Sequence, residues 1–337
     1  MADDSFYARK VAELFGCLHH ELTIHPDVAD LLPKMVWHLD EPLSDPAAIN
    51  TYLISKAARD QGILVLLNGM GGDEICGGYR SQLACLLAQK YRAFLPGVAR
   101  HLIESAVNRL PTATAKGGLR LARWAQRFVS MASQPGEERY ALIGMMDAAK
   151  YRSLFSWQHI AQQELSQHHH IRNLGSRLNR EGLSYLTRMC LADTEVYLPD
   201  HNLNYSDKCT MAASVEGRPP LTDHRIVEFM FSLAPDFRIR RLTQKFLLKK
   251  VAEKYLPREI IYRPKAPFGA PLRAWIRGGL SEMIGDLLSV ESLNRRGIYD
   301  SKFIWQLIEN DRAGREDNSH LIWRFLCNEL WLRAFFS

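Results

Sequence analysis

The stretch that decides the fold runs from residue 66 to residue 79 and reads Leu-Leu-Asn-Gly-Met-Gly-Gly-Asp-Glu-Ile-Cys-Gly-Gly-Tyr. It completes an apolar run, residues 63–67, of the kind found in strands buried on both faces of a parallel sheet. A glycine-rich loop with adjacent carboxylates, Asp73 and Glu74, follows. Ligands of open α/β sheets bind beyond the carboxyl ends of strands, where glycines let N–H groups approach phosphates and a carboxylate can hold Mg²⁺. The sequence therefore predicts a buried strand and a phosphate-binding loop, with a purely structural glycine turn as the alternative.

The residues before this strand alternate between helical and extended patterns. Apolar side chains at helical spacing predict a helix from Ser5 to Gly16, a second over residues 31–39 and a third after Asp45-Pro46. Alternating apolar and polar residues predict a short strand over residues 20–24. This order of helices and strands is typical of an α/β sheet.

Helical patterns dominate the chain after residue 79. Residues 96–136 are the most linker-like in composition but keep helical spacing, and residues 321–335 should pack into a core. We therefore expect a truncated α/β portion over residues 1–79. Residues 80–337 should form the mostly helical remainder of the same domain.

Composition excludes several functional classes. The 337 residues are 47% hydrophobic and 24% charged, which is ordinary for a globular protein, and the net charge of +6 is too diffuse to indicate a nucleic-acid partner. No apolar run approaches the roughly 20 residues that span a bilayer, and the N-terminus lacks a signal-peptide pattern. The histidine triplet at residues 168–170 favours a solvated loop over a metal site. Six scattered cysteines without a CxxC pair favour a reducing compartment, so we expect a cytoplasmic protein without a membrane partner.

Several further motifs occur in the order that asparagine synthetases show, so the chain resembles the C-terminal synthetase domain of that glutamine-hydrolysing family. They are Asp40-Glu41-Pro42-Leu43-Ser44-Asp45-Pro46, the loop over residues 68–79, Tyr197-Leu198-Pro199-Asp200, and the segments over residues 206–212, 215–225, 244–248 and 263–269. The resemblance implies an α/β fold with an adenine nucleotide α-hydrolase-like (ATP-pyrophosphatase) parallel sheet, incomplete at its N-terminus, and a large helical C-terminal part. It also implies a ligase that uses ATP and Mg²⁺ to activate aspartate, or another small carboxylate, as an acyl-adenylate that ammonia then attacks.

The resemblance further assigns roles to individual residues. Asp73 would hold Mg²⁺ and pyrophosphate, Lys265 would steady the α-phosphate and the leaving group, and Lys245 would be a second phosphate-facing cation. Fixed cations are needed there because charge builds up on the departing pyrophosphate. A helix N-cap at Asp73 and an ordinary surface lysine at Lys245 are the alternatives. The residues implied to surround the nucleotide are Gly69, Gly71, Gly72, Asp73 and Glu74.

Residues of later motifs are implied to surround the substrate. Glu216 and Arg218 form either a supporting ion pair or substrate contacts, and Asp207 and Lys208 are expected to shape the site from behind. Met70 departs from the family, whose asparagine synthetases carry a carboxylate at this position near the acyl-adenylate. Since a thioether neither takes a proton nor holds a cation, Met70 indicates an altered reaction or none.

A second departure is the absence from this sequence of the family's nucleotide-gripping motif, Ser-Gly-Gly-x-Asp-Ser, and of its glutaminase domain. We therefore expect the isolated chain to bind ATP weakly and to be inactive alone. A companion polypeptide could supply the missing strands, and an unpaired strand edge could drive self-association. A non-catalytic remnant or partner-binding module of the same fold is the alternative function.

Overall fold

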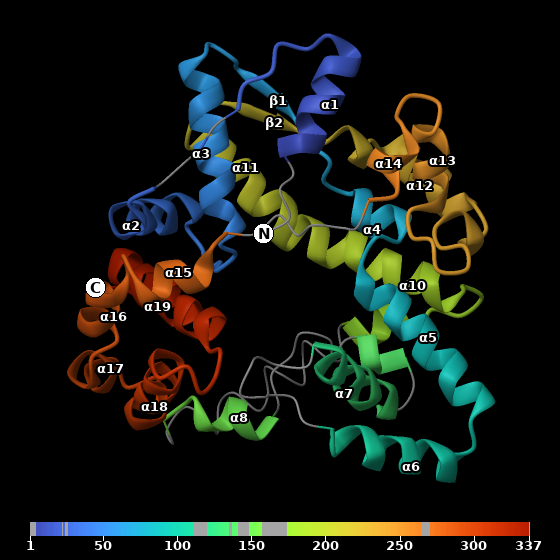
Figure 1. Cartoon of the computed structure of the whole chain (residues 1–337). Coiled ribbons are helices and arrows are strands. Elements are labelled where there is room, and N and C mark those ends of the chain that lie inside the picture. The colour runs from blue at the N-terminus through green and yellow to red at the C-terminus, as the bar shows by residue number, and fades with distance from the viewer. Residues whose placement is uncertain are drawn as a thin grey trace.

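Helices make up most of the chain in the computed structural model, which describes residues 5–21, 23, 26–110, 120–134, 137–140, 148–156, 174–263 and 270–336. Figure 1 shows α11 (Asn204–Met211) and the π-helix before it, η2 (Asp193–Leu203), running through the middle of the molecule. In Figure 1, α2 (Val28–Leu39), α3 (Ala47–Asp60) and the C-terminal helices lie toward one end of this axis, and α4 (Gly72–Cys76), in the loop that follows the first strand, lies toward the other end. The axis therefore connects the candidate site to the main core.

The three helices predicted before the first strand are confirmed. They are α1 (Ser5–Phe15), α2 (Val28–Leu39) and α3 (Ala47–Asp60). The Asp27 side chain caps α2 by accepting the N–H groups of Ala29 and Asp30, which have no partner within the helix. Asp40 ends α2 in the left-handed conformation, with φ at 50°.

The strand predicted over residues 20–24 is wrong as far as the structure describes it. His20, Glu21 and Thr23 are irregular, and residues 22 and 24 lie outside the described ranges. Glu21 forms an ion pair with Arg9 of α1 at 3.0 Å, so the segment is held against a helix rather than paired in a sheet. Alternation alone could not reveal that no described strand lies beside this segment.

The remaining elements that follow the first strand are nearly all helical, as predicted for the chain after residue 79. Their bounds are α4 (Gly72–Cys76), α5 (Arg80–Phe94), α6 (Gly97–Asn108), α7 (Arg120–Ser133), η1 (Glu137–Tyr140), α8 (Ala148–Ser153), α10 (Tyr185–Ala192), η3 (Pro220–Thr222), α12 (His224–Ser232), η4 (Pro235–Phe237), α13 (Phe246–Ala252), α14 (Arg258–Ile261), α15 (Leu272–Arg277), α16 (Ser281–Leu287), α17 (Val290–Arg296), α18 (Ser301–Arg312) and α19 (Ser319–Phe335). The histidine triplet at residues 168–170 lies outside the described ranges.

The sheet of the described chain has two short parallel strands, β1 (Val65–Leu67) and β2 (Glu216–Arg218). Leu66 lies opposite Gly217 in their register. The prediction of a strand after residue 63 is confirmed, but the prediction that it is buried on both faces is wrong. Leu64 is 53% exposed and Leu67 is 72% exposed. Helix α11 packs against the neighbouring strand β2, where the Thr210 side chain lies close to Gly217.

One edge of β1 is also unpaired within the described sheet. The carbonyl of Leu64 accepts the N–H of Glu216 at 2.8 Å, and the N–H of Asn68 donates to the carbonyl of Arg218 at 3.0 Å. Backbone groups of alternate residues point to the same side of a strand. The N–H and C=O groups of Val65 and Leu67 therefore point to the opposite edge, where the described chain places no strand.

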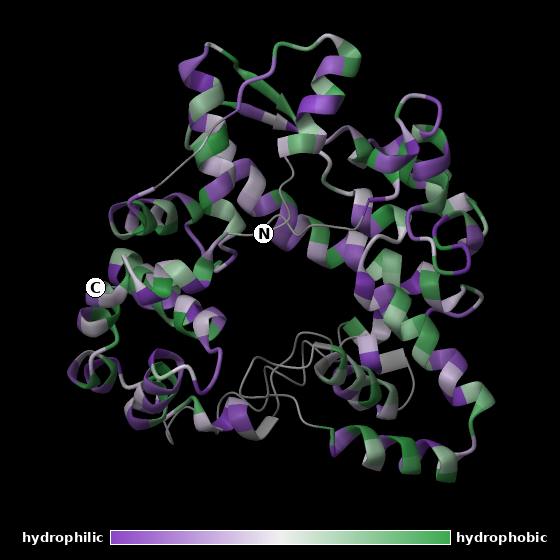
Figure 2. Ribbon diagram, viewed as in Figure 1, coloured by the Kyte–Doolittle hydropathy of each residue, from purple (hydrophilic) through white to green (hydrophobic). Residues whose placement is uncertain are grey.

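The main core lies between α2, α3 and the C-terminal helices. Leu32 and Ile49 contribute from the first part of the chain, and Trp323 and Leu326 of α19 contribute from the last, as predicted for residues 321–335. Residues on both sides of position 79 thus share one core, while a domain boundary at that position remains a prediction. Figure 2 shows apolar and polar residues mixed along most helices, as expected for amphipathic helices that bury one face. Among the described helices, none combines the length and apolar character that crossing a bilayer requires.

Candidate functional site

The candidate site is the tight loop that joins β1 to α4 and then to α5. Gly71 and Gly77 bracket α4 with φ angles of 82° and 72°, in the left-handed region that favours glycine. A side chain at Gly71 would also lie 2.7 Å from Cγ2 of Thr222. The glycines of the motif therefore permit a reversal of the chain directly beyond the carboxyl end of β1.

Two predicted site residues, Asp73 and Lys245, meet in this loop. The Nζ atom of Lys245 lies 3.0 Å from Oδ1 of Asp73, and both side chains are partly exposed. Gly78 lies against this pair so closely that a Cβ atom there would clash with Oδ1 of Asp73 and Cε of Lys245. The ion pair and the bare backbone of Gly78 therefore form one packed unit.

Lys245 reaches this position from an unusual backbone conformation. It precedes α13 with φ at 52°, in the left-handed region, where a residue with a side chain is strained. Its Nζ lies 3.7 Å from the position that a Cβ at Gly72 would take. The Lys245 amine thus faces a carboxylate and the glycine backbone of the loop, an arrangement that suits contact with an anion better than the position of an ordinary surface lysine does.

Glu74, predicted to contact the nucleotide, lies inside the protein. It is 1% exposed, and its Oε1 accepts the Tyr79 hydroxyl and the Asn202 side-chain N–H, the latter at 2.6 Å. Burial and the neighbouring Glu74 carboxylate raise the pKa of Tyr79. These bonds tie α4 to α5 and η2. A nucleotide contact for Glu74 stays a prediction, and the geometry favours a supporting role.

Two further residues, which the sequence analysis did not identify as site residues, donate hydrogen bonds to backbone carbonyls of the loop. The Gln244 side chain donates to the carbonyl of Tyr79 at 2.7 Å. Arg238 is fully buried and donates to the carbonyl of Ile75 at 3.0 Å and to that of Met230. Gln244 adjoins Lys245 in a motif and could have been noticed, whereas nothing in the local sequence marks Arg238.

A buried carboxylate lies behind this support. Oδ2 of Asp193, at the start of η2, accepts the side-chain N–H of Gln82 at 2.7 Å and the hydroxyl of Tyr140 at 2.6 Å. Burial raises the pKa of Asp193 to about 7, although both hydrogen bonds act to lower it. The Glu74 charge raises the pKa of Asp193 further, which couples the two carboxylates.

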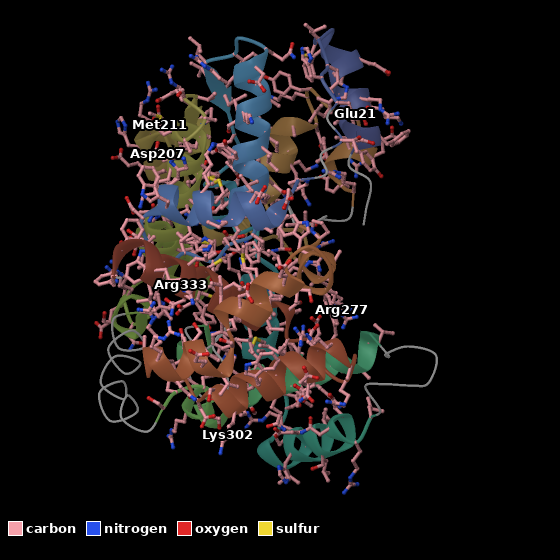
Figure 3. All side chains as sticks on the ribbon, turned by 90° about the vertical axis from the view of Figure 1, so that its left-hand side faces the viewer. Glu21, Asp207, Met211, Arg277, Lys302 and Arg333 are labelled. Carbon is pink, nitrogen blue, oxygen red and sulfur yellow. The ribbon has the colours of Figure 1, made fainter. Side chains whose placement is uncertain are left out.

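The residues predicted to shape the site lie on α2, α11 and β2. Lys208 of α11 donates to the carbonyl of Leu39 at 2.8 Å and pairs with Asp40, so it holds the C-terminus of α2. Asp207 is exposed on α11, as Figure 3 shows.

Glu216 and Arg218 lie 3.7 Å apart on the exposed ends of β2. That weak pair leaves their role open between support and substrate binding.

Met70 is half-buried and packs against the main core. Gly69 beside it is exposed, with open space where a side chain would be. Lys265 lies outside the described residues. The structure thus brings together Asp73, Lys245 and the glycine backbone and leaves the other predicted contacts untested.

The donor set suits a magnesium ion shared with phosphate oxygens rather than a metal site made by protein alone. Within the described ranges, no three His, Cys, Asp or Glu side chains come close enough to hold a metal ion. Asp73 offers one partly exposed carboxylate, and Mg²⁺ commonly takes only one or two from the protein. The residues present therefore fit a Mg²⁺ that arrives with phosphates.

A comparison with protein families finds that the asparagine synthase family model matches residues 1–333. The chain belongs to the asparagine synthase family. Its mostly helical α/β fold with a small parallel sheet is compatible with that family. The match covers nearly the whole chain, so the region compared is the synthetase domain.

Individual relatives show the same relationship at low identity. Glutamine-hydrolyzing asparagine synthetase 1 of Bacillus subtilis is 28% identical over 96% of this chain and 49% of its own length. A putative glutamine-hydrolyzing asparagine synthetase of Mycobacterium tuberculosis is 27% identical over 96% of the chain and 47% of its length. A Penicillium rubens protein named amidase chyE is 22% identical over 91% of the chain and 47% of its own length. The chain spans about half the length of the curated relatives it matches.

Gly78→Ala should destabilise the protein and disturb the candidate site, because its Cβ would clash with Asp73 and Lys245. We expect a loss of about 1–3 kcal/mol in the free energy of unfolding, measured by urea denaturation. Gly69→Ala is the matched control in the same loop and should change the free energy by less than about 0.5 kcal/mol. Equal midpoints for both variants would contradict the close packing of Gly78.

Asp193 should make the protein less stable as the pH rises. Its pKa in the folded chain, about 7, lies above the value of about 3.9 expected when unfolded, so the unfolded chain releases this proton first. The stabilisation is complete below about pH 4 and is lost as the pH rises through about 7. Between pH 5 and 7 we expect Asp193 to account for a loss on the order of 2 kcal/mol.

The measurement is urea denaturation at several pH values for the wild type and Asp193→Asn. The variant should be flatter between pH 5 and 7, while Asp207→Asn, which changes an exposed carboxylate, should follow the wild type. Parallel curves for the wild type and Asp193→Asn would show that Asp193 titrates as an ordinary carboxylate.

Proposed function

We propose that this chain is the adenylate-forming part of an asparagine synthetase, with an ATP-pyrophosphatase type of sheet. ATP would activate the side-chain carboxylate of aspartate, and ammonia would then form the amide. The observation that carries the proposal is the Asp73–Lys245 pair, 3.0 Å apart in a glycine loop beyond the end of β1. Family membership and the named relatives support the same chemistry.

The site residues suit the first step, in which a carboxylate oxygen attacks the α-phosphorus and the bond to pyrophosphate breaks. The Lys245 amine would stabilise the charge that develops on the phosphate oxygens. Mg²⁺ bound with the nucleotide would neutralise further phosphate charge, and Asp73 would hold it. Backbone N–H groups of the glycine loop would approach the phosphates. The missing side chains at Gly71 and Gly72 let the loop pack tightly against Thr222 and Leu221. The buried bonds of Glu74 would keep the loop fixed while charge moves.

Met70 favours a variation in the second step, in which ammonia attacks the acyl carbon and AMP leaves. A thioether packed against the core cannot accept the proton that ammonia must lose. The second candidate function is therefore amide formation on a different small carboxylate, with another proton acceptor. The relative named amidase chyE shows that the shared domain occurs in proteins described by other activities.

We further propose that a strand from outside this chain, in a companion polypeptide, pairs with β1. The strand is apolar and exposed, and its Val65 and Leu67 backbone groups face an edge without a described partner. Such an edge recruits other strands, and a second copy of the chain would fill it when the companion is missing. The companion would also complete the nucleotide site, so tight ATP binding would require it.

Lys245→Gln should weaken the binding of Mg²⁺–pyrophosphate about tenfold, because the variant loses the cation that faces the loop. Isothermal titration at saturating Mg²⁺ measures this affinity. Lys250→Gln is the matched control, since Lys250 lies in α13 just after Lys245 but pairs with Glu253. Unchanged affinity in Lys245→Gln, or equal losses in both variants, would reject the proposed role of the pair.

Val65→Pro should abolish self-association without unfolding the chain, because it removes an N–H that points to the free edge of β1. Leu66→Pro removes an N–H that points toward β2 and should cost about 3 kcal/mol of stability. Light scattering at about 50 μM, a concentration at which exposed edges associate, and urea denaturation give the two readouts. A wild-type chain that remains monomeric, or a Val65→Pro variant that associates equally, would contradict the proposed pairing.

A further inference from the structure

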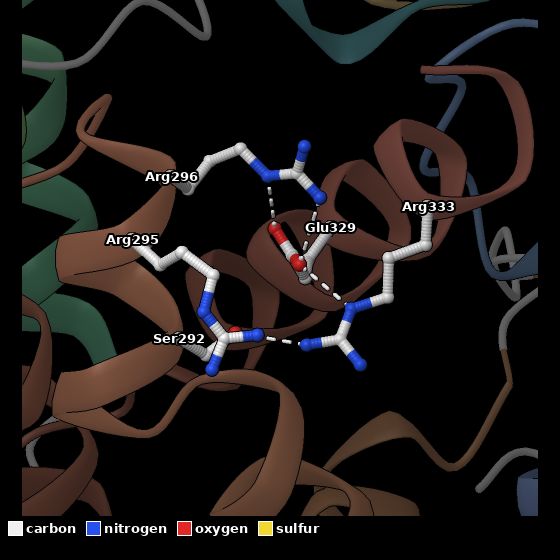
Figure 4. Close-up of a pocket in the computed structure, with 5 residues that line it drawn as sticks. All are labelled: Ser292, Arg295, Arg296, Glu329 and Arg333. Carbon is white, nitrogen blue, oxygen red and sulfur yellow. Dashed lines mark hydrogen bonds and ion pairs between the residues drawn. The ribbon is translucent and has the colours of Figure 1, made fainter. Parts of the chain in front are cut away.

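A second charged cluster, separate from the candidate site, lines a pocket of about 390 Å³ between α17 and α19. Its walls are Ser292, Arg295, Arg296, Glu329 and Arg333, drawn in Figure 4. In Figure 1 both helices lie on the side of the molecule opposite α4. The proposed ligase chemistry makes no use of this cluster.

Glu329 forms the base of the cluster and is 3% exposed. Its Oε2 accepts the Nε–H of Arg296 at 3.3 Å, and its Oε1 accepts from Nη2 of Arg296 at 3.2 Å. The Nε–H of Arg333 donates to the same Oε1 at 2.8 Å. Two guanidinium groups are thereby fixed from opposite helices, as Figure 4 shows.

Arg333 is held by a second hydrogen bond, to the side chain of Ser292 in α17. Its Nη2 donates to Oγ of Ser292 at 2.8 Å. Because the guanidinium is planar, two fixed N–H groups set the direction of the remaining ones. Nη1 of Arg296 and Nη1 of Arg333 make no hydrogen bond with the described residues, so each keeps donors for a ligand.

The charges of the pocket do not balance. Its lining carries three guanidinium groups and one carboxylate. The other nearby carboxylate, Glu291, pairs with Arg295 at 3.1 Å on the open surface, where it is 85% exposed and its attraction is screened by water. A buried carboxylate held by two arginines would already satisfy a purely structural link between the helices. The third arginine adds positive charge that this link does not need.

We propose that this pocket binds a small phosphate-bearing anion. The lining holds an excess of two positive charges, which matches a phosphate dianion better than a single carboxylate, and guanidinium forks suit phosphate oxygens. The volume exceeds that of inorganic phosphate, so the body of a phosphate monoester fits beside the phosphate. Glu329 acts as the positioning residue, because it orients Arg296 and Arg333 before the ligand arrives.

The test is isothermal titration of the full chain with inorganic phosphate and with ribose 5-phosphate, a monoester, at low salt and without Mg²⁺. We expect saturable binding of at least one ligand with a Kd on the order of 1 mM or tighter. Arg295→Gln should weaken it about tenfold, since a charge-assisted hydrogen bond is lost while the buried pair stays intact. Arg295→Glu should abolish it.

Two matched controls place the binding in this pocket. Arg312→Gln removes an exposed arginine of neighbouring α18 that pairs with Glu309, and it should leave the affinity unchanged. Lys245→Gln removes the cation of the candidate ligase site and should also leave it unchanged, so this result is separable from the proposed ligase function. Circular dichroism melting verifies that each variant folds.

The two ligands also distinguish the source of the phosphate. Equal affinities assign the pocket to free phosphate, and tighter binding of ribose 5-phosphate assigns it to a monoester; either result supports the proposal. No saturable binding up to about 10 mM overturns it. Binding that survives Arg295→Glu, or that is lost in Lys245→Gln, overturns it as well.

Discussion

The close approach of Gly78 to the Asp73–Lys245 pair is the constraint on which the candidate site depends. A carboxylate and an amine 3.0 Å apart neutralise each other, so each can stay near bare backbone without a bound ligand. Only glycine leaves room for both side chains at this point. The left-handed backbone of Lys245 is strained, and the ion pair offsets part of that cost. When phosphates arrive, the same amine has a stronger anionic partner available.

Polar groups buried behind the loop keep this arrangement rigid. Glu74 accepts hydrogen bonds from Tyr79, which precedes α5, and from Asn202 of η2. The buried guanidinium of Arg238 donates to the carbonyl of Ile75 near the end of α4. A buried charge is costly unless it is hydrogen-bonded, so such groups persist where they fix one conformation. Asp193 extends the network, and its raised pKa reflects how dry this region is.

The sequence predicted the parts of the site that are local. The glycine-rich stretch predicted a loop after the strand, and helical spacing predicted the first three helices and the last one. It could not predict contacts between distant segments: the pairing of Asp73 with Lys245 joins residues far apart in the chain, and Arg238 carries no local signature. The prediction that β1 is buried on both faces was wrong for the same reason. The apolar run gives the preference of the strand for apolar contacts, whereas the segments that pack beside it determine whether it is buried.

Near the site, the usual burial of apolar residues and exposure of charged ones is reversed. Apolar Leu64 and Leu67 face solvent, whereas carboxylates at Glu74 and Asp193 lie inside. Buried polar groups with good partners fix the loop in one conformation. The exposed leucines lie on a strand whose second edge has no partner in the described part of the chain, and the proposed additional strand would pair there. The support of the site is therefore present in the described chain, whereas the pairing of that edge is a proposal.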